Sequence, residues 1–298
     1  MAAEGAKTND RTPRSKSEGP LSPGLYLVAT PIGNASDITL RALHVLQAAD
    51  VVFAEDTRVT AKLLAIHGIA RPLHSYREHN ADHAEKAILR ELEKNHAVAL
   101  VSDAGTPLVS DPGERLVESV AAQGFAVFPI PGASAVLAAL TASGLATDRF
   151  FFAGFLPAKE NDRRRAIREL ENVPATLIFF EAPSRIADAL ADLAAVLGNR
   201  QAAVARELTK VYEEIKRAPL NELAQQFDGE IKGEIVIVVE GPQAGVATAN
   251  VETLDERLTQ ELKNHPVKDA AAIVAAALGL PRRTVYARAL ELKKAEEK

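Results

Sequence analysis

Short apolar runs alternate with amphipathic stretches through the first half of the chain. A short apolar run bounded by turn residues is typical of a buried strand, whereas apolar residues spaced three and four apart are typical of a helix. The pattern predicts strands at 25–30, 51–55, 71–75, 97–102 and 126–130. Helices are predicted between them, at 40–46, 58–67, 81–95, 113–122 and 133–143. This alternation indicates an α/β domain with a mostly parallel, covered sheet.

The first of these helices is predicted in the most detail. The apolar residues that fit one face of it are Leu40, Leu43, Val45 and Leu46. Asp37 and Thr39 stand just before it, and either side chain could cap its first turn.

The second half shows the same alternation with more polar strands, after a linker at 144–149. Strands are predicted at 149–157, 175–181, 202–207 and 234–241, and helices at 161–171 and 184–197. KVYEEIKRA at 210–218 alternates polar and apolar residues, which is typical of an edge strand. We therefore expect a second α/β domain with a more mixed sheet.

The two ends of the chain differ from this α/β pattern. The start, 1–23, is polar and is expected to be a disordered tail. A linker at 241–252 precedes three predicted helices, at 252–263, 267–278 and 283–295, with a helix-turn-helix outline. The expected divisions are a tail at 1–23, α/β domains at 24–145 and 146–242, and a helical extension at 251–298.

Composition narrows the classes of protein. The 298 residues include no cysteine, which excludes disulfides and cysteine-bound metals and is consistent with a cytoplasmic protein. Apolar runs stop well short of a membrane span, and the first residues lack the apolar core of a secretory signal. The net charge of −5 means that any contact with nucleic acid must use a local basic patch.

Glycine and proline turns follow several of the predicted strands. They are PIGN at 31–34, DAGTP at 103–107, DPG at 111–113 and PGAS at 131–134. Ligands of open α/β sheets bind outside the carboxyl ends of the strands, where three of these turns fall. Each turn alone is more typical of plain turn chemistry. The four together favour two interpretations equally: plain turn chemistry, and a backbone cradle for a zwitterionic or adenosyl ligand.

An ordered series of motifs resembles a known family. The series is VATPIGNASDITLRAL, AEDTR, LVSDAGTPLVSDPG, FPIPGASA, FFEAPSR, ARELTK and the KGE at 232–234. It is similar, from about residue 25 to 242, to the ribosomal small-subunit methyltransferase I family, a branch of the tetrapyrrole-methylase superfamily. The resemblance implies two α/β domains with S-adenosylmethionine (SAM) in the cleft between them, usually in a homodimer. It also implies 2′-O-methylation of the ribose of cytidine 1402 in the 16S rRNA of the small ribosomal subunit.

The resemblance also assigns residues to the SAM pocket. The matching positions are Pro31, Asp103, Ala104, Gly105, Thr106, Val109, Ser134, Ala135, Glu181, Ala182, Arg206 and Glu207. Two alternatives to the rRNA methyltransferase stay open. One is a SAM-dependent tetrapyrrole methylase. The other is an RNA-binding ribosome-assembly factor that holds SAM without turnover.

Methyl transfer to a ribose hydroxyl needs a group that removes a proton or polarises the oxygen. The residues expected in polarising, orienting or deprotonating roles are Glu55, Asp56, Arg58 and Lys210. Asp56 could instead be a helix cap with a local ion pair, and Lys210 a solvated strand end. The transfer needs no metal, so His79 and His83 are not expected to bind one.

RNA requires positive charge along its phosphates. Arg163, Arg164 and Arg165 form the densest basic run, and Arg282 and Arg283 begin a predicted C-terminal helix. Both groups are predicted RNA contacts, with a solvated helix face as the alternative for each.

Overall fold

The structure is a computed structural model that describes residues 19–110, 114–227, 231–242, 251–278 and 282–296. Most of the predicted tail, the DPG turn at 111–113 and most of the linker at 241–252 lie outside these ranges. The chain divides into two compact units, which we describe separately. One comprises 1–170 and 176–240, and the other comprises 171–175 and 241–298.

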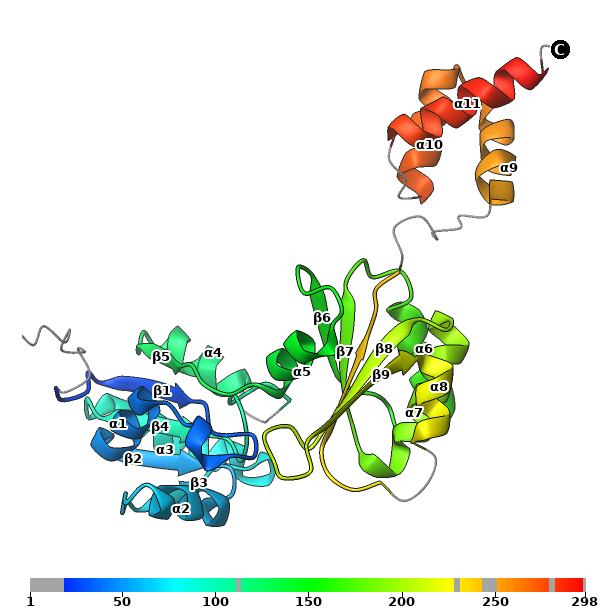
Figure 1. Cartoon of the computed structure of the whole chain (residues 1–298). Coiled ribbons are helices and arrows are strands. Elements are labelled where there is room, and N and C mark those ends of the chain that lie inside the picture. The colour runs from blue at the N-terminus through cyan, green and yellow to red at the C-terminus, as the bar shows by residue number, and fades with distance from the viewer. Residues whose placement is uncertain (1–18, 111–113, 228–230, 243–250, 279–281, 297–298) are drawn as a thin grey trace, which may run out of the picture. The chain divides into compact units, whose positions relative to one another are not determined.

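The first sheet lies in the N-terminal half of the larger unit (Figure 1). Its strands are β1 (Gly24–Val28), β2 (Val51–Ala54), β3 (Leu73–Ser75), β4 (Ala97–Val101) and β5 (Val127–Ile130). Their order is β3-β2-β4-β1-β5, and all pairs are parallel. The predicted parallel sheet is confirmed. Its carboxyl ends share one edge, which gathers the turns that follow β1, β4 and β5.

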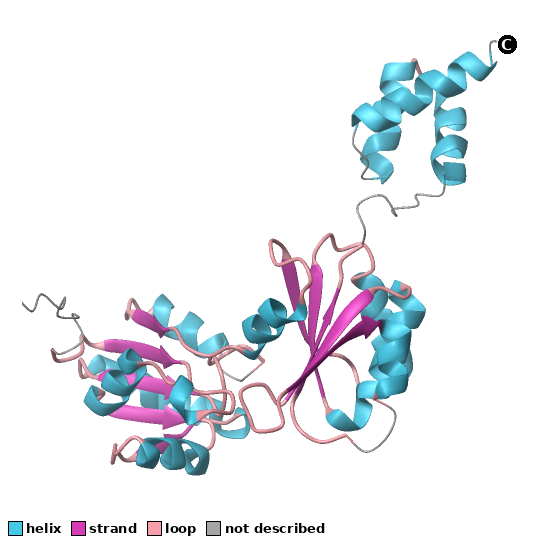
Figure 2. Ribbon diagram, viewed as in Figure 1, coloured by secondary structure: helices cyan, strands magenta, loops and turns pink. Residues whose placement is uncertain are grey.

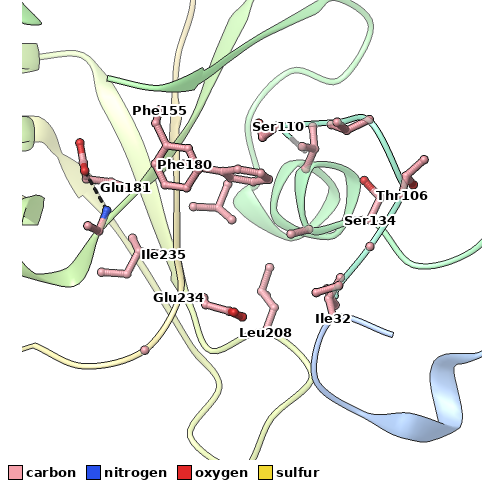
Figure 3. Close-up of a pocket in the computed structure, with 18 of the residues that line it drawn as sticks. Ile32, Thr106, Ser110, Ser134, Phe155, Phe180, Glu181, Leu208, Glu234 and Ile235 are labelled. Atoms are coloured by element: carbon pink, nitrogen blue, oxygen red, sulfur yellow. Dashed lines mark hydrogen bonds between the residues drawn. The ribbon is translucent and has the colours of Figure 1, made fainter. Parts of the chain in front are cut away.

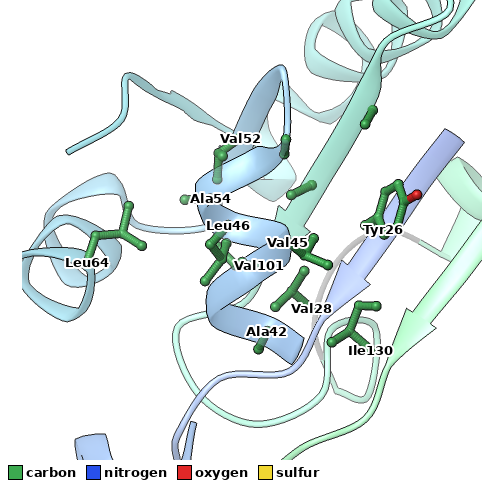
Figure 4. Packing of buried hydrophobic residues seen from close by; sticks show 13 residues of the cluster. Tyr26, Val28, Ala42, Val45, Leu46, Val52, Ala54, Leu64, Val101 and Ile130 are labelled. Atoms are coloured by element: carbon green, nitrogen blue, oxygen red, sulfur yellow. The ribbon is translucent and has the colours of Figure 1, made fainter. Parts of the chain in front are cut away.

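Helices pack on both faces of this sheet. They are α1 (Leu40–Ala48), α2 (Thr57–Ile66), α3 (Ala81–Glu93) and α4 (Glu114–Ala122). The next helix, α5 (Ala135–Ser143), packs instead on strands of the second half, where Leu140 meets Ile178 and Val236 in one apolar cluster. Short 3-10 helices lie at Ala35–Asp37 and Glu78–Asn80. Val28 packs with Leu46 and Leu64 from α1 and α2 (Figure 4), whereas Leu25 packs with Ile88 on the other face. Alternate residues of β1 therefore build separate core layers.

The helix α1 departs from its prediction in one residue. Thr39 caps it by accepting a hydrogen bond from the backbone N–H of Ala42. Val45 and Leu46 are buried as expected, but Leu40 is 86% exposed, so its placement on the buried face was wrong. Ala42, Val45 and Leu46 follow the spacing of one helical face, and Leu40 lies off that stripe.

The second sheet belongs to the same unit and is mixed, as predicted (Figure 2). Its strands are β6 (Phe150–Phe155), β7 (Thr176–Glu181), β8 (Gln201–Arg206), β9 (Glu214–Pro219) and β10 (Ile235–Val239). The order is β6-β7-β10-β8-β9, with only β6 and β7 parallel. The edge position of β9 is confirmed, but the strand begins at Glu214, and residues 210–213 form a turn instead.

Helices of the second half include one that the pattern missed. They are α6 (Glu160–Glu169), α7 (Ile186–Leu197) and α8 (Leu220–Gln226), with a 3-10 turn at Pro183–Arg185. The short α8 was not predicted, because its seven residues carry little helical period. Burial of Leu220 and Leu223 holds it in place.

The smaller unit contains three helices in its described part. They are α9 (Val251–Leu262), α10 (Val267–Leu278) and α11 (Arg282–Glu296). Leu258, Val274 and Val285 form their common core. Arg288 of α11 makes two hydrogen bonds to Asp255 of α9, at 2.6 and 2.9 Å. None of the helices in the described ranges is long and apolar enough to cross a membrane.

Candidate functional site

A cavity of about 390 Å³ lies in the larger unit, between residues that follow strands of both sheets (Figure 3). Its size is within the range of small-molecule sites. The lining residues are Ile32, Ala104, Gly105, Thr106, Val109, Ser110, Ser134, Ala135, Val136, Phe155, Phe180, Glu181, Ala182, Pro183, Leu208, Gly233, Glu234, Ile235 and Val236.

The turn after β4 forms one wall of this first cavity. Gly105 exchanges two backbone hydrogen bonds with Thr30, at 2.9 and 3.0 Å, which fixes the turn to the end of β1. Its φ of +75° is a conformation that glycine adopts without strain. Leu108 and Ser110 also have positive φ, which is costly for residues with a side chain. The surrounding fold therefore imposes the path of this loop.

The start of α5 forms a second wall. Ser134 caps the helix by accepting a hydrogen bond from the backbone N–H of Leu137 at 3.4 Å. Ala135 and Val136 follow it along the cavity. The first backbone N–H groups of a helix carry partial positive charge, which favours a carboxylate nearby.

The second half contributes an apolar wall. Phe155 and Phe180 pack edge to face, with ring centroids 5.6 Å apart. Ile235 and Leu208 continue the apolar surface toward Ile32 (Figure 3). Phe155 is 56% exposed, so its ring is available to a ligand. Such a surface suits a flat aromatic group.

Glu181 is the buried acid of the first cavity. It is 3% exposed, and its Oε1 accepts hydrogen bonds from the Ala182 N–H at 2.8 Å and from Arg185 at 2.6 Å. Its Oε2 is buried without a hydrogen-bond partner in the described chain. A buried carboxylate oxygen without a partner is costly, so this atom is open to a donor from a ligand.

A second cavity, of about 270 Å³, shares Ile32, Ala104 and Glu234 with the first. Its lining residues are Thr30, Pro31, Ile32, Gly33, Ala35, Val59, Thr60, Leu63, Ile66, Ser102, Asp103, Ala104, Lys210 and Glu234. Its ionisable residues are Asp103, Lys210 and Glu234. A ligand group in one cavity therefore adjoins a group in the other.

Lys210 reaches the second cavity from the turn between β8 and β9. Its ammonium contacts Glu207 at 2.7 Å and Glu234 at 2.9 Å. Burial opposes the charge on Lys210, but the hydrogen bonds to the two carboxylates outweigh it and raise the lysine pKa. Lys210 is thus a cation suited to orienting or polarising a substrate, and not to removing a proton. A Cβ on Gly33 would lie 2.5 Å from the Lys210 side chain, so the close approach requires glycine there.

The other predicted catalytic residues surround Asp103 and line neither cavity. Asp56 caps α2 and pairs with Arg58 at 2.6 Å and Arg77 at 2.9 Å. The hydrogen bond from Arg58 holds the pKa of Asp56 far below its ordinary range, so this carboxylate is a poor base. Glu55 accepts a hydrogen bond from the Asp103 N–H at 3.2 Å.

Asp103 itself is held from two sides. Its Oδ1 accepts the backbone N–H of Asp56 at 2.8 Å, and its own N–H donates to Glu55. Asp56 caps α2 and pairs with Arg58, as the alternative prediction for this residue stated. Glu55 and Asp56 thus hold Asp103, which lines the second cavity, and Arg58 holds Asp56.

Most of the residues assigned to the SAM pocket come together. Eight of the twelve line the first cavity: Ala104, Gly105, Thr106, Val109, Ser134, Ala135, Glu181 and Ala182. Pro31 and Asp103 line the second cavity instead. Arg206 and Glu207 line neither, because Arg206 pairs with Glu214 and Glu207 with Lys210.

Sequence reasoning missed the apolar wall of the first cavity. Phe180 and Leu208 lie inside the quoted motifs FFEAPSR and ARELTK, Ile235 directly follows the KGE motif, and Phe155 ends β6. The signals that could have found them were these motifs and the strand ends, but an apolar residue at either place is equally typical of the core.

The structure corrects the prediction that the basic run in α6 contacts RNA. Arg163 is 5% exposed, and its guanidinium contacts Asp192 of α7 at 2.7 Å and the backbone oxygen of Ala158. The prediction that Arg163 contacts RNA was wrong, because its hydrogen-bonding groups are turned into the fold. Arg164 also contacts Asp192, at 2.6 Å, but remains 43% exposed.

The remaining predicted RNA contacts lie at the surface. Arg165 is 70% exposed and pairs with Asp162 at 3.0 Å. Arg282 and Arg283 are exposed at the start of α11. The structure describes Arg282 onward but not the proline before it. Within the described ranges, no three histidine or acidic side chains group as a metal site.

Comparisons with known proteins agree with this architecture. Residues 24–224 match the model of the Tetrapyrrole (Corrin/Porphyrin) Methylases, and 248–293 match the RsmI C-terminal HTH domain. A "Ribosomal RNA small subunit methyltransferase I" from Mesorhizobium japonicum is 50% identical over 92% of this chain and 94% of its own length.

Two solved structures share the fold. Diphthine synthase aligns with 73% of this chain and 89% of its own, at 20% identity and a TM-score of 0.58. Uroporphyrin-III C-methyl transferase from Thermus thermophilus, complexed with S-adenyl homocysteine, aligns with 72% of this chain and 96% of its own, at 23% identity and a TM-score of 0.53. At these identities the likeness concerns the fold.

Proposed function

The chain belongs to the ribosomal RNA small subunit methyltransferase I family of tetrapyrrole-methylase fold, and from that premise we propose that it methylates the ribose 2′-oxygen of cytidine 1402 in 16S rRNA with SAM as donor. The match to a relative along nearly the whole chain carries this proposal. The match of the C-terminal helices to that family's own terminal domain favours it over a tetrapyrrole substrate.

The residues of the first cavity fit SAM. The backbone of Ala104–Thr106 and the start of α5 at Ser134 would hold the charged methionine end. Phe155 and Phe180 would contact the adenine ring. The unpartnered Oε2 of Glu181 would accept a hydrogen bond from a hydroxyl or amino group. When bound, SAM supplies a methyl group whose transfer to a hydroxyl oxygen releases a neutral thioether and one proton.

That proton needs an acceptor beside the ribose, and we assign the role of acceptor to Asp103. This carboxylate lines the second cavity, directly before the turn that lines the first. The Glu55 carboxylate accepts the Asp103 N–H at 3.2 Å, and the Asp56 N–H donates to the Asp103 carboxylate at 2.8 Å, which restricts its position. Lys210, held as an ammonium, would orient or neutralise oxygen atoms of the RNA at the same cavity.

The smaller unit is proposed to contact RNA through Arg282 and Arg283, which are exposed at the start of α11. Exposed cations at a helix start suit phosphate contacts. We also propose, from the family resemblance, that the protein acts in the cytoplasm as a homodimer. Sedimentation of the purified chain tests the dimer.

The decisive experiment is transfer of labelled methyl from SAM to purified small ribosomal subunits that lack their own modification, with the labelled nucleotide mapped. Label on the 2′-oxygen of cytidine 1402 is expected. Label on another nucleotide would keep the rRNA activity and reject the site. SAM binding without label on any rRNA, followed by label on a tetrapyrrole, would move the activity to the other branch of the superfamily.

A further inference from the structure

A strip of apolar side chains on α2 lies at the second cavity. Val59, Leu63 and Ile66 are spaced four and three residues apart, so they share one face of the helix. All three line the cavity, and Val59 and Ile66 are 42% and 66% exposed. This apolar strip is part of a concave site rather than a scattered set of surface residues.

A buried polar atom stands beside the apolar strip. Thr60 is 2% exposed and lines the same cavity, and its Oγ1 has no hydrogen-bond partner among the described residues. A hydroxyl buried without a partner destabilises the chain that carries it. Its presence at a cavity wall points to a ligand atom that completes the hydrogen bond.

We propose that the second cavity receives the base of the nucleotide that is methylated, turned out of the RNA. The base would lie on the apolar strip of Val59, Leu63 and Ile66, with a polar atom of its edge hydrogen-bonded to Thr60. This inference rests on the proposed function and adds to it the surface that selects the nucleotide.

The neighbourhood of the cavity favours RNA as its occupant. It shares Ile32 and Ala104 with the first cavity, so a nucleoside here has its ribose beside the methyl donor. Asp103 and Lys210 supply an acceptor and a cation for hydroxyl and phosphate oxygens. A cavity volume of about 270 Å³ suits one extruded nucleotide, because a paired helix is far wider.

The first variant fills the cavity. Val59→Trp places a large side chain at an exposed position, so folding is expected to be retained. Affinity for unmethylated small subunits, measured by filter binding in the presence of S-adenosylhomocysteine, is expected to fall at least about 10-fold. Affinity for S-adenosylhomocysteine is expected to stay unchanged. Leu40→Trp, at an 86% exposed helix position that lines neither cavity, is the matched control.

The second variant, Thr60→Val, replaces the buried hydroxyl by a methyl group and keeps the shape of the side chain. Thr60→Val should leave the melting temperature equal or higher, because the lost hydroxyl has no partner in the free protein. Subunit affinity and methyl transfer at low RNA concentration are expected to fall about 3- to 10-fold. A purely structural threonine would not combine higher stability with weaker RNA binding. Thr141→Val, whose hydroxyl bonds within α5, is the control.

The outcomes separate this inference from the proposed function. Unchanged subunit affinity in both Val59→Trp and Thr60→Val, with rRNA methylation intact, overturns the nucleotide cavity alone. A change in sedimentation of Val59→Trp, with RNA affinity unchanged, makes the strip an interface between copies of this chain and also overturns it. Absence of rRNA methylation by the unsubstituted chain overturns the proposed function, and this inference with it.

Discussion

The two cavities of the larger unit share three lining residues but differ in the chemical groups that line the rest of their walls. The first is formed by backbone turns, a helix start and an apolar wall, with one unpartnered oxygen of Glu181. The second is formed by a helix face and three ionisable side chains, with an unpartnered hydroxyl on Thr60. A cofactor of fixed structure suits preorganised backbone, whereas an acceptor that must lose a proton suits titratable groups. We therefore propose donor binding for the first cavity and acceptor chemistry for the second.

The strongest test of the donor side is Gly105→Arg. A side chain at φ +75° strains the backbone, and an arginine also occupies the cavity. SAM affinity, measured by calorimetry, is expected to fall at least about 100-fold. Gly105→Ala separates the two causes, because its Cβ would meet Ile32 at an ordinary 3.5 Å. Strain alone predicts a loss of about 5- to 30-fold. Normal SAM binding by Gly105→Arg would remove the donor from the first cavity.

The matching test of the acceptor side is Asp103→Asn. The asparagine can keep the hydrogen bond accepted from the Asp56 N–H, so shape and support are preserved. Loss of the proton acceptor is expected to lower the methyl-transfer rate about 100- to 10,000-fold in single-turnover assays, with SAM affinity unchanged. A normal rate would assign the proton to another group. A parallel loss of SAM affinity would contradict the assignment of SAM binding and proton transfer to separate cavities.

Lys210→Met tests the cation of the second cavity. Without the ammonium, Glu207 and Glu234 lose their shared partner, and methyl transfer is expected to fall about 10-fold. The pH dependence of stability gives an independent measurement. Because the Lys210 pKa is raised above 10.5, its contribution is full below that pH and is lost as pH rises through the raised value.

At acid pH the stability contribution of this ion pair changes with pH in the opposite direction. The hydrogen bond from Lys210 lowers the Glu207 pKa below 4.5, so its contribution is full above that pH and is lost as pH falls through the lowered value. The difference in melting temperature between the unsubstituted chain and Lys210→Met is therefore expected to be constant from about pH 5 to pH 10 and to shrink outside that window. A difference that varies inside the window would contradict the pairing.

The smallest effect is expected for Arg282→Ala with Arg283→Ala. Removing two phosphate contacts should reduce the slope of log affinity against log salt by about 1.4 for single-stranded RNA. SAM affinity and the single-turnover rate at saturating RNA should not change, because neither residue lines the first or the second cavity. Lys94→Ala, which removes one exposed cation and its ion pair with Glu91 in the larger unit, is the control for loss of surface charge elsewhere. An unchanged slope would make these arginines an ordinary solvated helix face.

The two basic runs show why one sequence signal can have different outcomes. Arg163 and Arg282 each stand in an arginine-rich helical segment, and nothing local distinguishes them. Arg163 is buried because Asp192, 29 residues later, lies on the neighbouring helix α7. Arg282 and Arg283 are exposed. A pairing between distant residues has no signature in either segment, so the sequence could not separate the two cases.

Apart from the short helix α8, the sequence by itself determined the order of strands and helices, the parallel first sheet and the turns that meet at its carboxyl edge. These follow from local periodicity and from turn residues such as Gly105, which adopts a positive φ without strain. The ordered motifs likewise predicted eight residues that line the first cavity.

Only the tertiary structure decided which acid lines a cavity and which acids support it. The sequence predicts catalytic roles for Glu55 and Asp56 and a place in the SAM pocket for Asp103, but contacts between the ends of β2 and β4 make Glu55 and Asp56 supports for Asp103. Tertiary contacts also set the charge of Lys210, through Glu207 and a Glu234 that lies 24 residues away. Burial and ionisation depend on what packs around a side chain, and that is fixed by residues far apart in the chain.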